Sequence, residues 1–113
     1  MLNLSIVVFA LAAIGGLVLA TFHFRDKNRP WPLAILHGLL GATGLILLAI
    51  PVLKGSAPAL GRAALGLFVA AALGGFLLFA MHLQKKKLPS LVVIIHALAA
   101  VAAFTLLLVS VYS

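Results

Sequence analysis

Apolar residues run along this chain in four long stretches, separated by three short polar segments. The stretches cover about residues 4–24, 31–53, 60–83 and 89–112. Each contains the roughly 20 residues that a helix needs to cross a hydrocarbon layer about 30 Å thick. They are continuously apolar, whereas the strands of a membrane barrel alternate polar and apolar residues. The pattern predicts an all-α integral membrane bundle of four helices, with residues 1–113 forming a single transmembrane domain.

The composition supports a membrane protein. Of the 113 residues, 65% are apolar and 8% are charged, whereas about a quarter of the residues in an average soluble domain are charged. Cysteine is absent, which excludes disulfides and thiolate-ligated metal centres. The first stretch has no basic segment before it and is long for the apolar part of a signal peptide, so we expect a retained span.

The net charge of +7 is concentrated in two of the three turns. The first turn holds Arg25, Lys27 and Arg29, the third holds Lys85, Lys86 and Lys87, and the second has only Lys54 and Arg62. Short loops rich in Lys and Arg stay in the cytoplasm. We therefore expect turns 25–30 and 84–88 to be cytoplasmic and both termini to face outward, as in a bacterial inner-membrane protein. The charge indicates topology and contact with anionic lipid, and not nucleic-acid binding.

The second half of the chain repeats the first. A shift of 59 residues makes 15 of 54 aligned positions identical. The rarer matches are His23 with His82, His37 with His96, Gly15–Gly16 with Gly74–Gly75, and Pro30 with Pro89. The repeat units are residues 1–54 and 60–113. An offset that carries one helical hairpin onto the next predicts two tandem hairpins in a parallel repeat, related by a pseudo-twofold axis along the membrane normal.

All four histidines flank the two basic turns. His37 and His96 are about nine to ten residues from the middle of their turns, and His23 and His82 about four to five. At 1.5 Å per residue, the first pair lies about 7 Å deeper in the membrane. The pseudo-twofold axis predicts a deep pair, His37 with His96, and an outer pair, His23 with His82, each on diagonally opposed helices. Ionisable groups inside a span are rare and commonly functional.

Small residues follow each deep histidine on its own helix face. Positions i+4 and i+7 share a face with position i; these are Gly41 and Gly44 after His37, and Ala100 and Ala103 after His96. Two opposed imidazoles above smooth faces predict a site for a flat, apolar disc such as haem b. Gly16 and Gly75 lie two turns below the outer histidines. They either make room for the edge of such a ring or are ordinary packing glycines.

One histidine per helix, with small residues nearby, resembles the bis-histidine b-type membrane cytochromes that have a four-helix core. In that family the first and third core helices commonly ligate one haem, and the second and fourth another. The resemblance implies membrane electron transfer, with His37, His96, His23 and His82 as ligands of haem iron. Two haem groups are favoured and one is the alternative. The chain departs from familiar members because all four histidines lie toward one side of the membrane.

The predicted partners follow from this resemblance and from the charge. Lipid surrounds the bundle, and electrons are exchanged with the quinone pool or with an acidic redox protein at the basic turns. A second copy of the chain is a further candidate partner. An electron carrier is favoured over a catalyst, with a quinone-linked oxidoreductase as the alternative.

Two other functions remain open. Imidazole also suits zinc and copper, so a histidine-lined metal-binding or metal-transport protein is the first alternative. The length and the four spans also resemble small multidrug-resistance transporters, which rely on a glutamate inside the first helix. The single acid of this chain, Asp26, lies in a basic turn instead.

Overall fold

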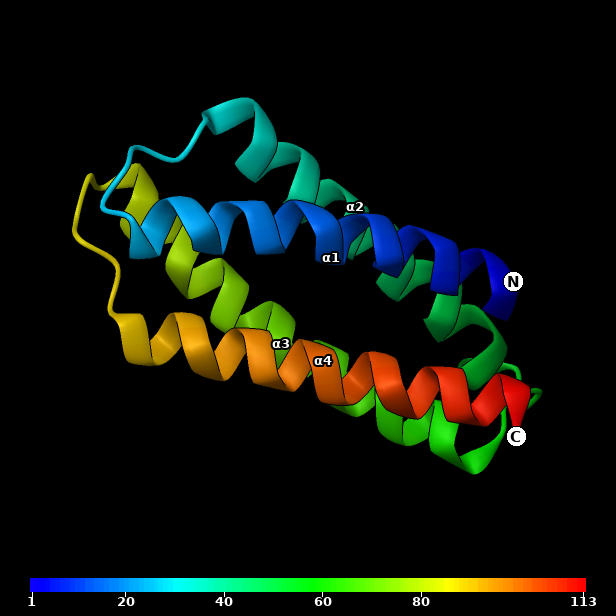
Figure 1. The fold of residues 1–113 in the computed structure, drawn as a ribbon. Helices are drawn as coiled ribbons and strands as arrows, with labels where there is room; N and C mark the ends of the chain where they lie inside the picture. The colour runs from blue at the N-terminus through cyan, green and yellow to red at the C-terminus, as the bar shows by residue number, and fades with distance from the viewer.

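The computed structural model describes all 113 residues as four long helices joined by three short turns (Figure 1). Helix α1 spans Leu2–Phe24, α2 spans Trp31–Leu53, α3 spans Ala59–Leu83 and α4 spans Ser90–Tyr112. These bounds agree with the predicted spans to within two residues. Each helix is long and apolar enough to cross a membrane. The predicted fold class, an all-α transmembrane bundle of four helices, is confirmed.

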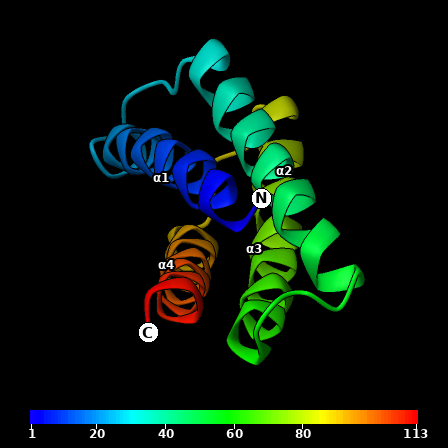
Figure 2. The same cartoon turned by 90° about the vertical axis from the view of Figure 1, so that its right-hand side faces the viewer.

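The helices form two hairpins that lie side by side. Helix α1 packs on α2 and α3 packs on α4, and the hairpins meet through α2 with α3 and α1 with α4. Helices α1 and α3 are therefore diagonal across the bundle, as are α2 and α4 (Figure 2). This is the arrangement that a repeat of two helical hairpins predicts.

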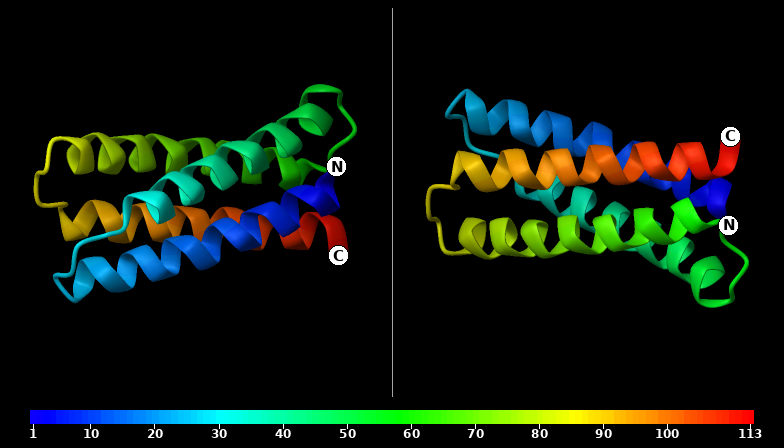
Figure 3. Two further views of the ribbon diagram at one scale, coloured as in Figure 1. Left: turned by 90° about the horizontal axis from the view of Figure 1, so that it is seen from above. Right: turned by 90° about the horizontal axis from the view of Figure 1, so that it is seen from below.

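Both basic turns lie at one end of the bundle, and both termini lie at the other with the turn between α2 and α3 (Figure 3). Helices α1 and α3 end alike. Asp26 and Lys85, which follow the C-cap residues, have φ angles of 54° and 56°. Their amide groups donate to the carbonyl oxygens of His23 and His82, at 3.1 Å in both cases. Left-handed residues that end a helix in this way are a common C-terminal motif. The two halves of the repeat therefore have the same backbone conformation at this helix end.

The core repeats as well. Phe9 of α1 stacks on its repeat counterpart, Phe68 of α3, with ring centroids 3.8 Å apart and ring planes 3° apart. Leu48 and its counterpart Leu107 are fully buried in the same cluster. Many other large apolar side chains point outward, as expected where the surroundings are lipid tails that are as apolar as leucine.

Candidate functional site

The deep histidines meet across the bundle diagonal. The ring centroids of His37 on α2 and His96 on α4 are 6.2 Å apart, and the ring planes are nearly perpendicular, at 87°. Helices α2 and α4 do not pack directly on each other, so the two side chains meet across the diagonal of the bundle. The structure thus brings together the pair that the repeat predicts.

Each deep imidazole is held by a backbone carbonyl of its own hairpin. Nδ1 of His37 donates to the carbonyl oxygen of Ala12 at 2.8 Å, and Nδ1 of His96 donates to that of Ala71 at 2.7 Å. Ala12 and Ala71 are buried counterparts in the repeat. Because a carbonyl can only accept, Nδ1 carries the proton and Nε2 presents a lone pair.

Both Nε2 atoms of the deep pair are free. Neither makes a hydrogen bond, and neither is among the polar atoms sealed inside the protein without a partner. Each therefore faces accessible space. A histidine whose Nδ1 is fixed by a carbonyl and whose Nε2 is free has the arrangement that metal-ligating histidines almost always show.

The glycine pairs let the hairpin helices approach the deep rings. A Cβ on Gly16 would lie 2.8 Å from Cε1 of His37, and one on Gly75 would lie 3.1 Å from Cε1 of His96. The preceding glycine of each pair faces the Cβ of the same histidine, at 3.7 Å and 3.6 Å. These glycines are packing residues, and what they pack against is the imidazole itself. They position the deep histidines.

The small residues that follow the deep histidines lie at two levels. Nothing comes within 4 Å of a Cβ built on Gly41, and its counterpart Ala100 is half-buried. At the next level Gly44 and Ala103 are buried. A Cβ on Gly44 would lie 2.8 Å from the ring of Phe9. Open space therefore exists only at the level of Gly41 and Ala100. At the level of Gly44 and Ala103, the phenylalanine stack occupies the space.

The outer histidines are engaged by other groups. Nδ1 of His23 accepts from Nη1 of Arg29 at 3.5 Å, and Nε2 donates to the hydroxyl of Ser90 at 3.1 Å. His82 instead lies flat on Trp31, with centroids 3.9 Å apart. Ser90 and Trp31 are counterparts in the repeat, so the two copies have diverged at this level. The outer pair lacks the free, symmetric Nε2 atoms of the deep pair.

The vertical distance between the two pairs is larger than predicted. The ring of His37 lies against Gly16, which precedes His23 by seven residues on α1. Seven residues of helix correspond to about 10 Å, against the 7 Å expected from the turns. The larger value refers to the level of the His37 ring along α1, whereas the smaller value refers to residue positions counted from the turns.

Sequence reasoning missed the carbonyl partners and the aromatic contacts of the site. The spacing rules used within one helix carry no information about Ala12, Ala71, or the stack of Phe9 on Phe68. A usable signal was nevertheless present, because both pairs are identical residues at matching positions of the repeat. Such identity is not specific to the interior, however, because Leu39 and Leu98 also match and are both exposed.

The two deep imidazoles form a ligand set of two. No group of three or more His, Cys, Asp or Glu side chains converges in the structure. Protein zinc sites use three or four protein ligands. The deep pair therefore suits a metal that receives its remaining ligands from a cofactor.

No protein-family model, curated protein or solved structure matches this chain. The function is therefore inferred from the geometry of the site.

Proposed function

We propose that the protein binds haem b between His37 and His96 and carries electrons within the membrane. The separation of the two rings carries this proposal. A metal with nitrogen ligands about 2 Å away on opposite sides, each nitrogen about 1 Å from its ring centre, holds two imidazole centroids roughly 6 Å apart. The centroids of the deep pair are 6.2 Å apart.

The ligand chemistry also favours haem over the alternatives. A porphyrin supplies four ligands of its own, so two imidazoles complete the coordination of its iron. A zinc site built from protein alone would need additional side chains near the deep pair, and none converge there. When bound, haem supplies one-electron chemistry at its iron. The protein orients the two imidazoles through the carbonyl oxygens of Ala12 and Ala71.

One haem is better supported than two. Both nitrogens of His23 already have partners, and one face of His82 is covered by Trp31. We therefore assign the single haem to the deep pair. We also propose that the basic end faces the cytoplasm, since both basic turns lie at that end. Electrons would then enter from a quinone or a donor on that side, because the deep pair lies nearer to it.

The test is a haem titration of the purified protein. The wild-type protein should become red and give the reduced-minus-oxidised spectrum of a six-coordinate b haem. His37→Ala and His96→Ala should each abolish that spectrum, whereas replacement of either outer histidine should have a milder effect. Thr43→Ala is the matched control, because its hydroxyl bonds only to the Leu39 carbonyl of its own helix. Size-exclusion chromatography and circular dichroism verify that every variant is folded.

Two results would contradict the proposal. A folded protein that stays colourless with added haemin would exclude haem and restore the metal-binding and transport alternatives. Equal loss of haem from variants of all four histidines would exclude the single-haem assignment and favour a coupled pair of sites.

A further inference from the structure

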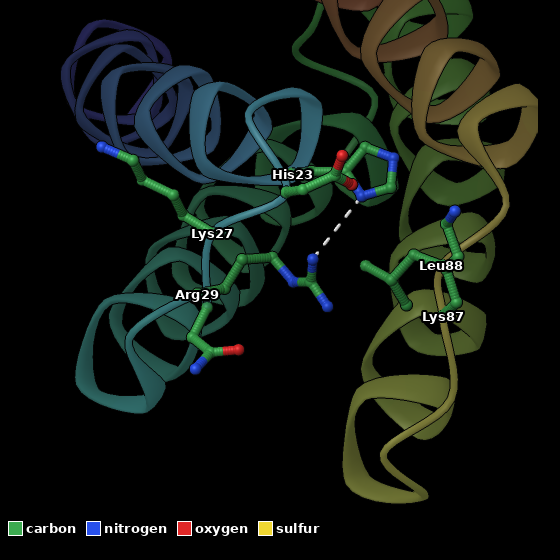
Figure 4. Close-up of a pocket in the computed structure, with 7 residues that line it drawn as sticks. His23, Lys27, Arg29, Lys87 and Leu88 are labelled. Carbon is green, nitrogen blue, oxygen red and sulfur yellow. Dashed lines mark hydrogen bonds between the residues drawn. The ribbon is translucent and has the colours of Figure 1, made fainter.

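A hollow of about 280 Å³ lies at the basic end of the bundle, between the first and third turns (Figure 4). All but one of its lining residues are polar or charged: His23, Asp26, Lys27, Asn28, Arg29, Lys87 and Leu88. A water molecule takes up about 30 Å³ in the liquid. The hollow therefore has room for a polyatomic ion together with water.

Positive charge dominates this hollow. Arg29 and Lys87 come from different turns, and so from different halves of the repeat. Asp26, the only acidic side chain, lines the same hollow and cannot balance the cations around it. Figure 4 shows the guanidinium of Arg29 beneath the His23 ring, with the side chain of Leu88 between it and Lys87, whereas Lys27 points away from it. The charge balance and this placement favour an anion beside Arg29.

Arg29 has hydrogen-bond donors that the protein does not use. Its Nε atom is buried and has no hydrogen-bond partner. Its Nη1 atom makes one long contact, 3.5 Å, to a ring nitrogen of His23. A guanidinium offers five N–H donors and no acceptor, and leaving a buried donor of a charged group unpaired is costly. An anion in the hollow would provide the missing acceptors.

We propose that this hollow binds the phosphate group of an anionic phospholipid. Arginine recognises phosphate with two parallel hydrogen bonds, and lysine adds a point charge. The hollow lies where the apolar helices end, and Phe24 contacts its lining residue His23; aromatic residues mark the level of lipid headgroups. A lipid is therefore the phosphate source that the position favours. The inference does not depend on the haem site.

A phosphate bound here would link the two hairpins. Arg29 belongs to the turn after α1, and Lys87 to the turn after α3. The hairpins pack less extensively on each other than the helices pack within each hairpin. A shared anion at the basic end would therefore strengthen the contact between the hairpins, which is the less extensive one. Lipid binding should consequently raise the resistance of the protein to unfolding.

The experiment measures thermal unfolding of the full-length protein in a neutral detergent while phospholipid is added. Phosphatidylglycerol should raise the unfolding midpoint, whereas phosphatidylcholine should not. Arg29→Gln and Lys87→Gln should each weaken the apparent affinity for phosphatidylglycerol by about tenfold or more. Lys85→Gln is the matched control, since it removes the same charge from the same end but lies outside the hollow. Arg62→Gln, at the far end, is a second control.

Several outcomes would overturn the inference. An equal loss of affinity in Lys85→Gln would mean diffuse attraction to the basic end and no defined site. Equal stabilisation by phosphatidylcholine would exclude recognition of negative charge. Protection by glycerol phosphate at the same concentration would overturn the assignment to a lipid. If Arg29→Gln does not fold, Arg29→Lys keeps the charge but loses the two parallel hydrogen bonds. Undiminished affinity in Arg29→Lys would then count against the site.

Discussion

Replacement of Gly16 by alanine should disturb the deep pair without removing a ligand. The new Cβ would lie 2.8 Å from Cε1 and 3.3 Å from Nδ1 of His37, whereas carbon atoms in contact rest about 3.5–4.0 Å apart. The ring must therefore move by about 0.7 Å, or helices α1 and α2 must separate. Either movement strains the 2.8 Å hydrogen bond from His37 to Ala12, because that carbonyl belongs to α1 as well.

We expect the haem affinity of this variant to fall about 10- to 100-fold, the loss that follows when a group orienting a metal-ligating histidine is disturbed. A functional site tolerates displacements of only about 0.5 Å. The free energy of unfolding should change less. Alanine is favoured over glycine inside a helix by about 0.5–1 kcal/mol, which offsets part of the overpacking cost of about 1–3 kcal/mol.

The assay is a haem titration followed by the Soret absorbance, paired with unfolding in mixed detergent micelles. Gly66→Ala is the control, because a Cβ there meets nothing within 4 Å. Gly75→Ala, with its contact of 3.1 Å to His96, should show an intermediate loss. Unchanged affinity in Gly16→Ala would refute the steric reasoning, and so would an equal loss in Gly66→Ala.

Three further substitutions test the surroundings of the site. Gly41→Leu should abolish haem uptake in a folded protein, because it fills space that is now open; a normal haem content would place the pocket elsewhere. Gly44→Ala should lower the free energy of unfolding by about 1–3 kcal/mol, since its Cβ would lie 2.8 Å from the Phe9 ring. Wild-type stability of this variant in detergent unfolding would show that the Phe9 ring can move without cost. Lys85→Gly should raise the same free energy by about 1 kcal/mol, because lysine adopts a left-handed φ of 56° there; the absence of a gain would mean that this turn is unstrained.

The sequence by itself determined the four spans, the repeat and the end of the bundle at which the histidines lie. The length of an apolar run is a local property, so the bounds of the helices could be predicted to within two residues. The offset between the halves gives His37 and His96 the same depth. Two spans at that offset run in the same direction, so the diagonal pairing required no knowledge of side-chain contacts.

Only the tertiary structure decided which faces of the helices meet inside the bundle. A helix that is apolar all round shows no preferred inward face in its hydrophobic pattern, so the rotation of each span about its own axis stayed open. That rotation gives Gly16 its contact with His37, and Gly44 its contact with Phe9. It also supplies the Ala12 carbonyl that fixes the tautomer of His37. Such contacts join residues far apart in the sequence, and spacing within one helix cannot specify them.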